Sequence, residues 1–178
     1  MKKPLYQLKQ RHDVIRQFTP NWFTVTMGTG VVALILAEFS TFAQSINIFA
    51  TLLWQMNIVL FSLFSVLYIL RWLIYPHEAR QIFTHSSMAL FLGTIPMGLA
   101  TIINGFLKFG VVLYGDIAIQ IAQMLWYVDV FLAVLIGVFV PFLMFSRQKH
   151  ELKTMTAMWL LPIVACEVTA ASGGLLLQ

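Results

Sequence analysis

The stretch FTPNWFTVTMGTGVVALIL, residues 18–36, begins as a polar turn and continues as an apolar helix long enough to enter a membrane. Two glycines, Gly28 and Gly30, and three threonines, Thr24, Thr26 and Thr29, interrupt the apolar run. Glycine weakens a membrane helix, and the backbone groups that it frees must face protein or water because lipid cannot satisfy them. The stretch therefore predicts a helix that turns one face away from lipid.

Composition places nearly the whole chain in a membrane. Of the 178 residues, 60% are hydrophobic and 10% are charged, whereas about a quarter are charged in an average soluble domain. A membrane span needs about 20 apolar residues, and spans are predicted at 22–39, 48–72, 87–107, 117–145 and 155–177, after a basic cytoplasmic tail at 1–21. We therefore predict an all-α integral membrane protein with about five transmembrane helices arranged as consecutive helical hairpins.

Lysine and arginine are distributed unevenly along these spans. Of the 11 basic residues, all but Lys108 fall in the N-terminal tail or toward the loops on one side of the membrane. They are Lys2, Lys3, Lys9, Arg11, Arg16, Arg71, Arg80, Arg147, Lys149 and Lys153. Because cationic loops stay in the cytoplasm, we expect a cytoplasmic N-terminus and a plasma (inner) membrane location. This asymmetry and contact with anionic lipid explain the net charge of +4, so no nucleic-acid partner is expected.

The five predicted spans are of two kinds. The second and fourth are rich in aromatic and branched residues and are interpreted as outer helices, whereas the first, third and fifth carry small and polar residues and are interpreted as inner helices. Two hypotheses stand for the inner helices: they surround a pathway, or their small residues serve tight helix contacts. The candidate pathway residues are Thr24, Thr26, Gly28, Thr29, Gly30, Gly93, Thr94, Pro96, Gly98, Thr101, Asn104, Pro162, Glu167, Thr169, Ser172, Gly173 and Gly174.

Two carboxylates lie within predicted spans, where ionisable groups are costly and suggest function. Asp129 lies near the middle of the fourth span, and we expect it to pair with a hydroxyl or to stay protonated against a neighbouring helix. Glu167 lies five residues beyond Pro162 in the fifth span. An ionised carboxylate facing the pathway would repel anions, so Glu167 is interpreted as neutral, as turned away from the pathway, or as a group in proton coupling.

Several classes of function lack the residues that they need. His12, His77, His85 and His150 all lie outside the spans, whereas a membrane haem requires facing histidines within helices. No HxxxH pair suggests a metal site, Cys166 is the sole cysteine, and neither a phosphate-binding glycine loop nor a nucleophile elbow occurs. We expect no enzyme activity, no metal and no cofactor.

Three motifs together resemble one family of membrane transporters. FTPNWFTVTMGTGVVALIL, FLGTIPMGLATIINGF and MTAMWLLPIVACEVTAASGGLLL are similar, in order and spacing, to the tellurite-resistance and dicarboxylate transporter family. That family includes TehA-type bacterial channels, fungal malate and sulfite transporters, and plant guard-cell slow anion (SLAC1-like) channels. One departure is His85-Ser86, where many relatives carry His-Pro before the third span.

The resemblance implies an anion pathway built from ten helices, lined by the odd-numbered ones, in a subunit that commonly assembles as a trimer. The five spans resemble half of that pore, so we interpret the chain as an N-terminal half that lacks its C-terminal half, or as one of several copies that assemble. The resemblance implies a channel or carrier for small anions, with C4-dicarboxylates such as malate first and tellurite tolerance as an associated phenotype. The alternative is a membrane fragment or assembly subunit that transports nothing.

Overall fold

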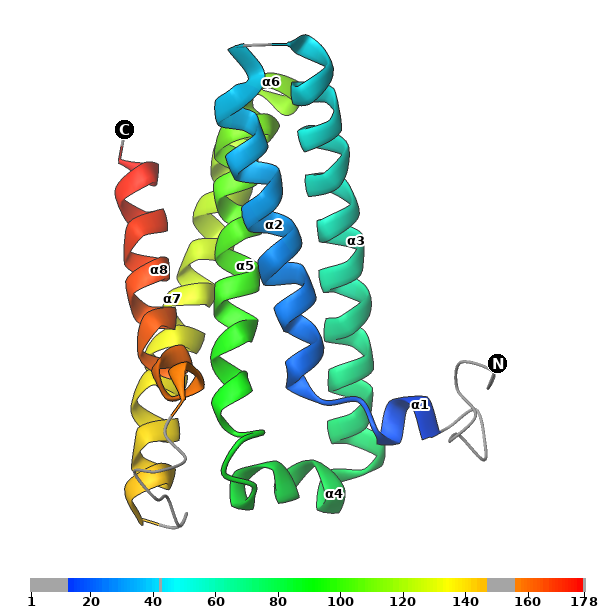
Figure 1. Cartoon of the computed structure of the whole chain (residues 1–178), viewed down its shortest axis with the longest axis vertical. Helices are drawn as coiled ribbons and strands as arrows, with labels where there is room; N and C mark the ends of the chain where they lie inside the picture. The colour runs from blue at the N-terminus through cyan, green and yellow to red at the C-terminus, as the bar shows by residue number, and fades with distance from the viewer. Residues whose placement is uncertain (1–12, 42, 147–155, 178) are drawn as a thin grey trace.

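Five long apolar helices make up the protein (Figure 1). The computed structural model describes residues 13–41, 43–146 and 156–177, and within these ranges it contains helices and turns but no strand. The segments long and apolar enough to cross a membrane are Pro20–Glu38, Gln44–Ile74, Leu90–Tyr114, Asp116–Ser146 and Ala157–Leu176. The predicted fold class, an all-α membrane protein, is confirmed.

The helices carry the labels of Figure 1. Short helices α1 (Asp13–Arg16) and α4 (Pro76–Arg80) lie at the same end of the bundle. The long helices are α2 (Phe23–Glu38), α3 (Gln44–Ile74), α5 (Thr94–Gly105), α7 (Asp116–Ser146) and α8 (Leu161–Leu176). Helix α5 continues through a π-helical turn, Phe106–Gly110, into α6 (Val111–Tyr114).

The observed helices differ from the expected spans mainly at their ends. Helix α3 begins at Gln44 rather than at residue 48, because hydropathy detects the apolar middle of a helix and misses its polar first turn. The third helical segment begins with a 3-10 turn, Leu90–Gly93, after the expected start at residue 87. Each 31-residue helix is about 46 Å long, which is enough to cross the hydrocarbon core and both interfaces.

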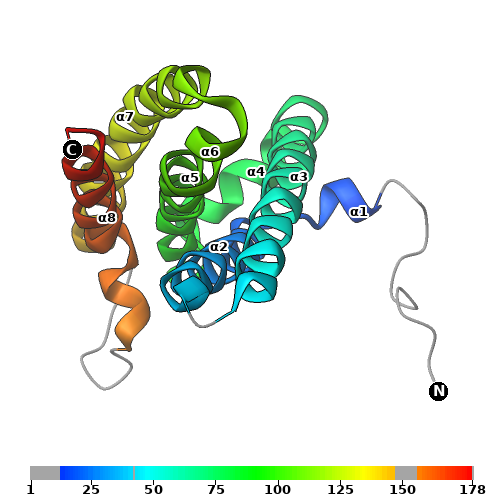
Figure 2. The ribbon, with the colours of Figure 1, turned by 90° about the horizontal axis from the view of Figure 1, so that it is seen from above.

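Helix α5 lies at the centre of the bundle. The views in Figures 1 and 2 place α2 and α3 on one side of α5 and α7 and α8 on another. In the most apolar part of the third helical segment 72% of the residues are buried, whereas only 11% are buried in α3. The expectation that the third span is an inner helix and the second an outer one therefore agrees with their burial. The fourth span, expected to be outer, is 33% buried, as much as the first and more than the fifth at 22%, so burial within this chain does not separate these three.

Three glycines allow neighbouring helices to approach α5 closely. A Cβ atom on Gly98 would lie 2.7 Å from the Thr26 hydroxyl of α2. On Gly105 it would meet the Trp54 indole of α3. On Gly93, just before α5, it would lie 2.5 Å from the carbonyl oxygen of Leu161 in α8. Small residues at these positions therefore serve helix packing, as the second hypothesis for the inner helices requires.

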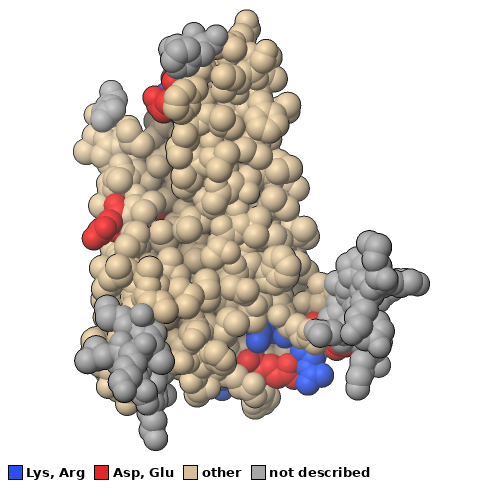
Figure 3. Space-filling view, in the orientation of Figure 1, with Lys and Arg blue, Asp and Glu red and all other residues tan. Residues whose placement is uncertain are grey.

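Charged side chains gather mainly at the ends of the bundle, and the face between them shows an acidic patch at its left edge and is otherwise almost free of charge (Figure 3). Arg16, Arg71 and Arg80 belong to the end that carries α1 and α4, while Lys108 lies at the opposite end and pairs with Glu38 at 2.8 Å. The other basic residues, Lys2, Lys3, Lys9, Arg11, Arg147, Lys149 and Lys153, lie outside the described residues, as do His12 and His150.

The close contact at Gly93 predicts opposite effects for two glycine-to-alanine changes. Gly93→Ala should lower the free energy of unfolding by about 1–3 kcal/mol, because the added methyl group meets backbone atoms that cannot rotate away. Gly28→Ala should be neutral or stabilising, since nothing lies within 4 Å of a Cβ there and alanine favours a helix by about 1 kcal/mol over glycine. Thermal unfolding of the purified chain in detergent, followed by circular dichroism, measures both, and equal stability of the two variants would contradict the packing at Gly93.

Candidate pathway surface

Helices α2 and α8 both pack against α5 (Figure 2). The candidate residues lie on these three helices, except Gly93, which ends the 3-10 turn before α5. The structure divides them by exposure. Ten are buried: Thr26, Gly30, Gly93, Thr94, Pro96, Gly98, Thr101, Pro162, Thr169 and Ser172. Thr24, Thr29, Asn104 and Gly173 are half-buried, and Gly28, Glu167 and Gly174 are exposed. The buried group lies between helices of this chain, so the exposed and half-buried group forms its open surface.

Three of the four buried threonine hydroxyls, those of Thr26, Thr94 and Thr101, are engaged with backbone carbonyls. Thr26 donates to the Phe23 carbonyl at 2.8 Å, and Thr101 donates to the Gly98 carbonyl at 2.8 Å. Thr94 lies 2.7 Å from the carbonyl of Phe91 and 3.1 Å from that of Pro20, which precedes α2. A hydroxyl group has one hydrogen to donate, so in this arrangement these side chains stabilise helix ends and helix contacts.

Asn57 of α3 is a buried polar residue that the sequence reasoning placed on an outer helix and overlooked. Its Nδ2 donates to the Thr101 hydroxyl at 3.3 Å, and a Cβ on Gly30 would collide with both groups. An asparagine in the apolar middle of the helix was the available signal, because polar side chains in membranes turn toward other helices. Asn57 thus joins α2, α3 and α5 at one point.

Asp129 connects α7 to α8. The Thr169 hydroxyl donates to Asp129 Oδ2 at 2.7 Å, and Asp129 is fully buried. Trp126, one turn earlier in α7, donates from Nε1 to the Thr169 carbonyl at 2.9 Å, while its ring covers Gly173. The expectation that Asp129 pairs with a hydroxyl is confirmed, and Thr169 is the hydroxyl residue.

Glu167 is exposed on α8, together with Gly174 two turns later. At this depth in a membrane a charged carboxylate in contact with lipid is costly. Glu167 must therefore either face water or protein, or carry a proton that neutralises its carboxyl group. Within the described residues, no group of three His, Cys, Asp or Glu side chains is arranged to hold a metal ion.

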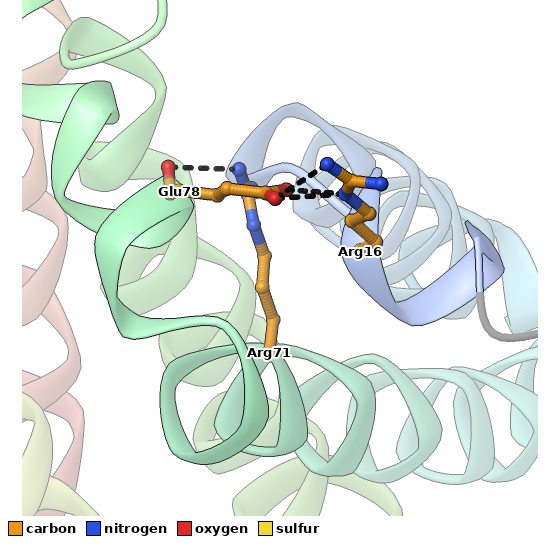
Figure 4. Close-up of polar contacts among 3 residues, drawn as sticks. All are labelled: Arg16, Arg71 and Glu78. Carbon is orange, nitrogen blue, oxygen red and sulfur yellow. Dashed lines mark hydrogen bonds and ion pairs between the residues drawn. The ribbon is translucent and has the colours of Figure 1, made fainter.

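A polar clamp closes the end of the bundle that carries α1 and α4 (Figure 4). Arg16 pairs with the Glu78 carboxylate at 2.7 Å, and Arg71 donates to the carbonyls of Phe18 and Glu78. The hydrogen bond from Arg16 holds the pKa of Glu78 below its ordinary value. The ion pair therefore stabilises the folded state fully at pH values above the pKa that the Glu78 carboxyl has in the unfolded chain. This stabilisation is lost as the pH falls through the lowered pKa of the folded state.

Arg71 is the second residue whose role the sequence reasoning missed, since it was counted only as a basic loop residue. The side chain is 7% exposed and comes from the last turn of α3. By bonding to Phe18, it fixes the segment that leads into α2, while Thr94 bonds to Pro20 in the same segment. The start of α2 is thereby positioned from both α3 and α5.

Comparison with known proteins gives consistent matches over the described helices. A family model described as voltage-dependent anion channel matches residues 17–178. A sulfite efflux pump of Arthroderma otae is 40% identical over 93% of this chain and 45% of its own length. The malic acid transport protein of Schizosaccharomyces pombe is 27% identical over 97% of this chain and 39% of its own length. The chain therefore spans less than half the length of these relatives, and no solved structure gave a significant match.

The Asp129 contact predicts that the hydroxyl group of Thr169 contributes more to the stability of the chain than its methyl group does. Thr169→Val should destabilise the chain by about 1–3 kcal/mol, because it leaves a buried carboxyl oxygen without its donor. Thr169→Ser retains the donor and should lose much less. Thermal unfolding in detergent measures both, and equal losses in the two variants would show that the hydrogen bond does not join α7 to α8.

Proposed function

The chain belongs to the voltage-dependent anion channel family, and we propose that α2, α5 and α8 form part of the wall of a membrane pathway for a small oxyanion, with sulfite as the first candidate. The observation that carries the choice of sulfite is the 40% identity, over nearly the whole of this chain, to proteins named as sulfite efflux pumps.

The chemistry of the open surface supports passage of an anion without tight binding. Helices α2, α5 and α8 contain no lysine or arginine, so an anion there meets neutral dipoles that attract it without trapping it. Thr29 and Asn104 are half-buried, and their hydroxyl and amide hydrogens suit the oxygen atoms of sulfite. Gly28 and Gly174, being exposed and without side chains, leave room beside these donors.

Glu167 gives the surface a negative group that an anion pathway must accommodate. It is exposed on α8, where an ionised carboxylate repels sulfite and a protonated one does not. We assign Glu167 to the pathway as a carboxyl group that carries a proton when the anion passes.

The proposal includes an orientation and an assembly. The end with Arg16, Arg71 and Arg80 faces the cytoplasm of a plasma or inner membrane, by the preference of cationic segments for that side. The open surface on α2 and α8 borders the pathway, and the rest of the wall comes either from further helices, as the greater length of the relatives suggests, or from other copies in a trimer.

Malate is the second candidate, because a relative of 27% identity is named as a malic acid transport protein. Malate is larger than sulfite and carries two carboxylates, so it requires a wider pathway. A comparison of sulfite with malate as substrates therefore tests which of the two assignments within this family applies.

Flux measurements in liposomes test the proposal, with the chain co-expressed with a five-span C-terminal half that supplies the rest of the wall. Sulfite-loaded vesicles should release sulfite faster than malate-loaded vesicles release malate at equal concentration, and Glu167→Gln, which keeps the shape without a titratable group, should make sulfite release less dependent on pH. The chain alone should release little of either anion. Faster malate release would reverse the substrate assignment, and release of both anions at the background of protein-free vesicles, with both halves present, would contradict the proposed pathway.

A further inference from the structure

A groove on the outside of the bundle lies apart from the proposed pathway. Trp54 and Ile58 of α3 form one wall, Ile117 and Ile121 of α7 form the other, and Phe106 of the π-helical turn completes the lining. The cavity volume is about 430 Å³. In Figure 2, α3 and α7 stand on different sides of α5, so the groove marks the place where these two outer helices leave a space over the central one.

The groove runs along the direction in which the helices cross the membrane. Tyr114 and Ile117 lie next to the start of α7, at the end of the bundle opposite the arginine clamp. Ile58 lies 14 residues into α3, which corresponds to about 21 Å along the helix axis. The groove therefore extends from an interface into the hydrocarbon core, and both helices that border it expose large apolar side chains to the surroundings, such as Val59 and Met124.

The surroundings decide what fills such a groove. Water is absent at this depth, and an empty groove forfeits dispersion contacts along its walls. A helix is about 10 Å across, whereas a single extended hydrocarbon chain is narrower and apolar, which suits a space of about 430 Å³ lined mainly by apolar side chains. Gln55 and Tyr114 are lining residues with polar side-chain ends, and Tyr114 at the interface suits contact with a polar headgroup, as interfacial tyrosines commonly do.

We propose that this groove is a specific binding site for one acyl chain of a phospholipid from the leaflet opposite the arginine clamp. The chain packs between Ile58 and Ile121 and covers Phe106, so that α3 and α7 contact each other through the lipid. Phe106 packs edge-on against Trp54, with ring centroids 5.1 Å apart, and Trp54 in turn donates to the Ile102 carbonyl of α5. The bound chain therefore rests on side chains that hold α3 against the centre of the bundle.

Photochemical cross-linking tests this site directly. The purified chain is placed in nanodiscs of phosphatidylcholine that contain a small fraction of an analogue with a diazirine in its acyl chain. Peptide mass spectrometry then locates the labelled residues. Labelling should concentrate on Phe106, Ile117 and Ile121 and should saturate at one lipid per chain.

Two neighbouring substitutions provide a matched comparison. Ile58→Trp fills the groove and should reduce labelling at Ile117 and Ile121 by about tenfold or more, the change expected when a well-packed contact is lost. Val59→Trp adds the same side chain at a position that is 66% exposed and outside the groove, and it should leave labelling unchanged. Ile58→Ala widens the groove and should retain the label at Ile117 and Ile121. If Ile58→Trp does not fold, the labelling of Ile58→Ala is compared with that of the unchanged chain instead.

Three results would overturn the proposal. Labels spread evenly over the exposed residues of α3 and α7 would indicate ordinary surrounding lipid. Labelling at Ile121 that survives Ile58→Trp in a folded protein would place the lipid elsewhere. Absence of lipid label, together with disulfide cross-links between two copies that carry Ile58→Cys or Ile121→Cys in a Cys166→Ala background, would make a second copy the occupant.

Discussion

The close approach of helices to α5 is the constraint on which the rest of the structure depends. In a membrane, helices gain nothing from leaving water, so their association rests on packing and on hydrogen bonds between them. Gly98 and Gly105 bring α2 and α3 within contact of the α5 backbone, and Gly93 does the same for α8. Larger residues at these positions would separate the helices and lengthen the bonds that Asn57 and Trp54 make to α5.

Hydrogen bonds add direction to this packing. Asp129 and Thr169 align α7 with α8, while Asn57 and Thr101 align α3 with α5. Each pair turns its polar atoms inward and leaves apolar side chains on the outer surface, as membrane helices require. The Arg71 clamp completes the arrangement where the chain leaves the hydrocarbon core, because it holds the segment that leads into α2. Of the two carboxyl groups near the middle of the spans, Asp129 of α7 is buried, whereas Glu167 of α8 remains exposed.

The sequence predicted the class of fold because apolar length and composition alone distinguish a membrane helix. For Asp129 it left two alternatives, a hydroxyl partner or a protonated carboxyl group, and the structure shows the hydroxyl of Thr169 as the partner. It did not distinguish α5 from α2 and α8, because all three carry similar small and polar residues and only three-dimensional packing makes α5 the buried one. Asn57 and Arg71 were missed for a related reason: each stands in a helix that is otherwise outer, and its role depends on partners 44 and 53 residues away in the chain. Gly28, Gly30 and Gly93 are indistinguishable in the sequence, because each is a glycine beside a threonine in a predicted span. Only Gly28 of the three has open space around it in the structure.

The central claim is that the open surface of α2 and α8 borders water rather than lipid. Cysteine reactivity tests it most directly, in a Cys166→Ala background with Gly28→Cys on α2, Gly174→Cys on α8 and Val59→Cys as the lipid-facing reference on α3. A charged, water-soluble thiol reagent added to the chain in liposomes should modify positions 28 and 174 much faster than position 59, and sulfite should slow the first two reactions. Equal, slow modification at all three positions would contradict the account and would place the small-residue face of α2 and α8 against lipid.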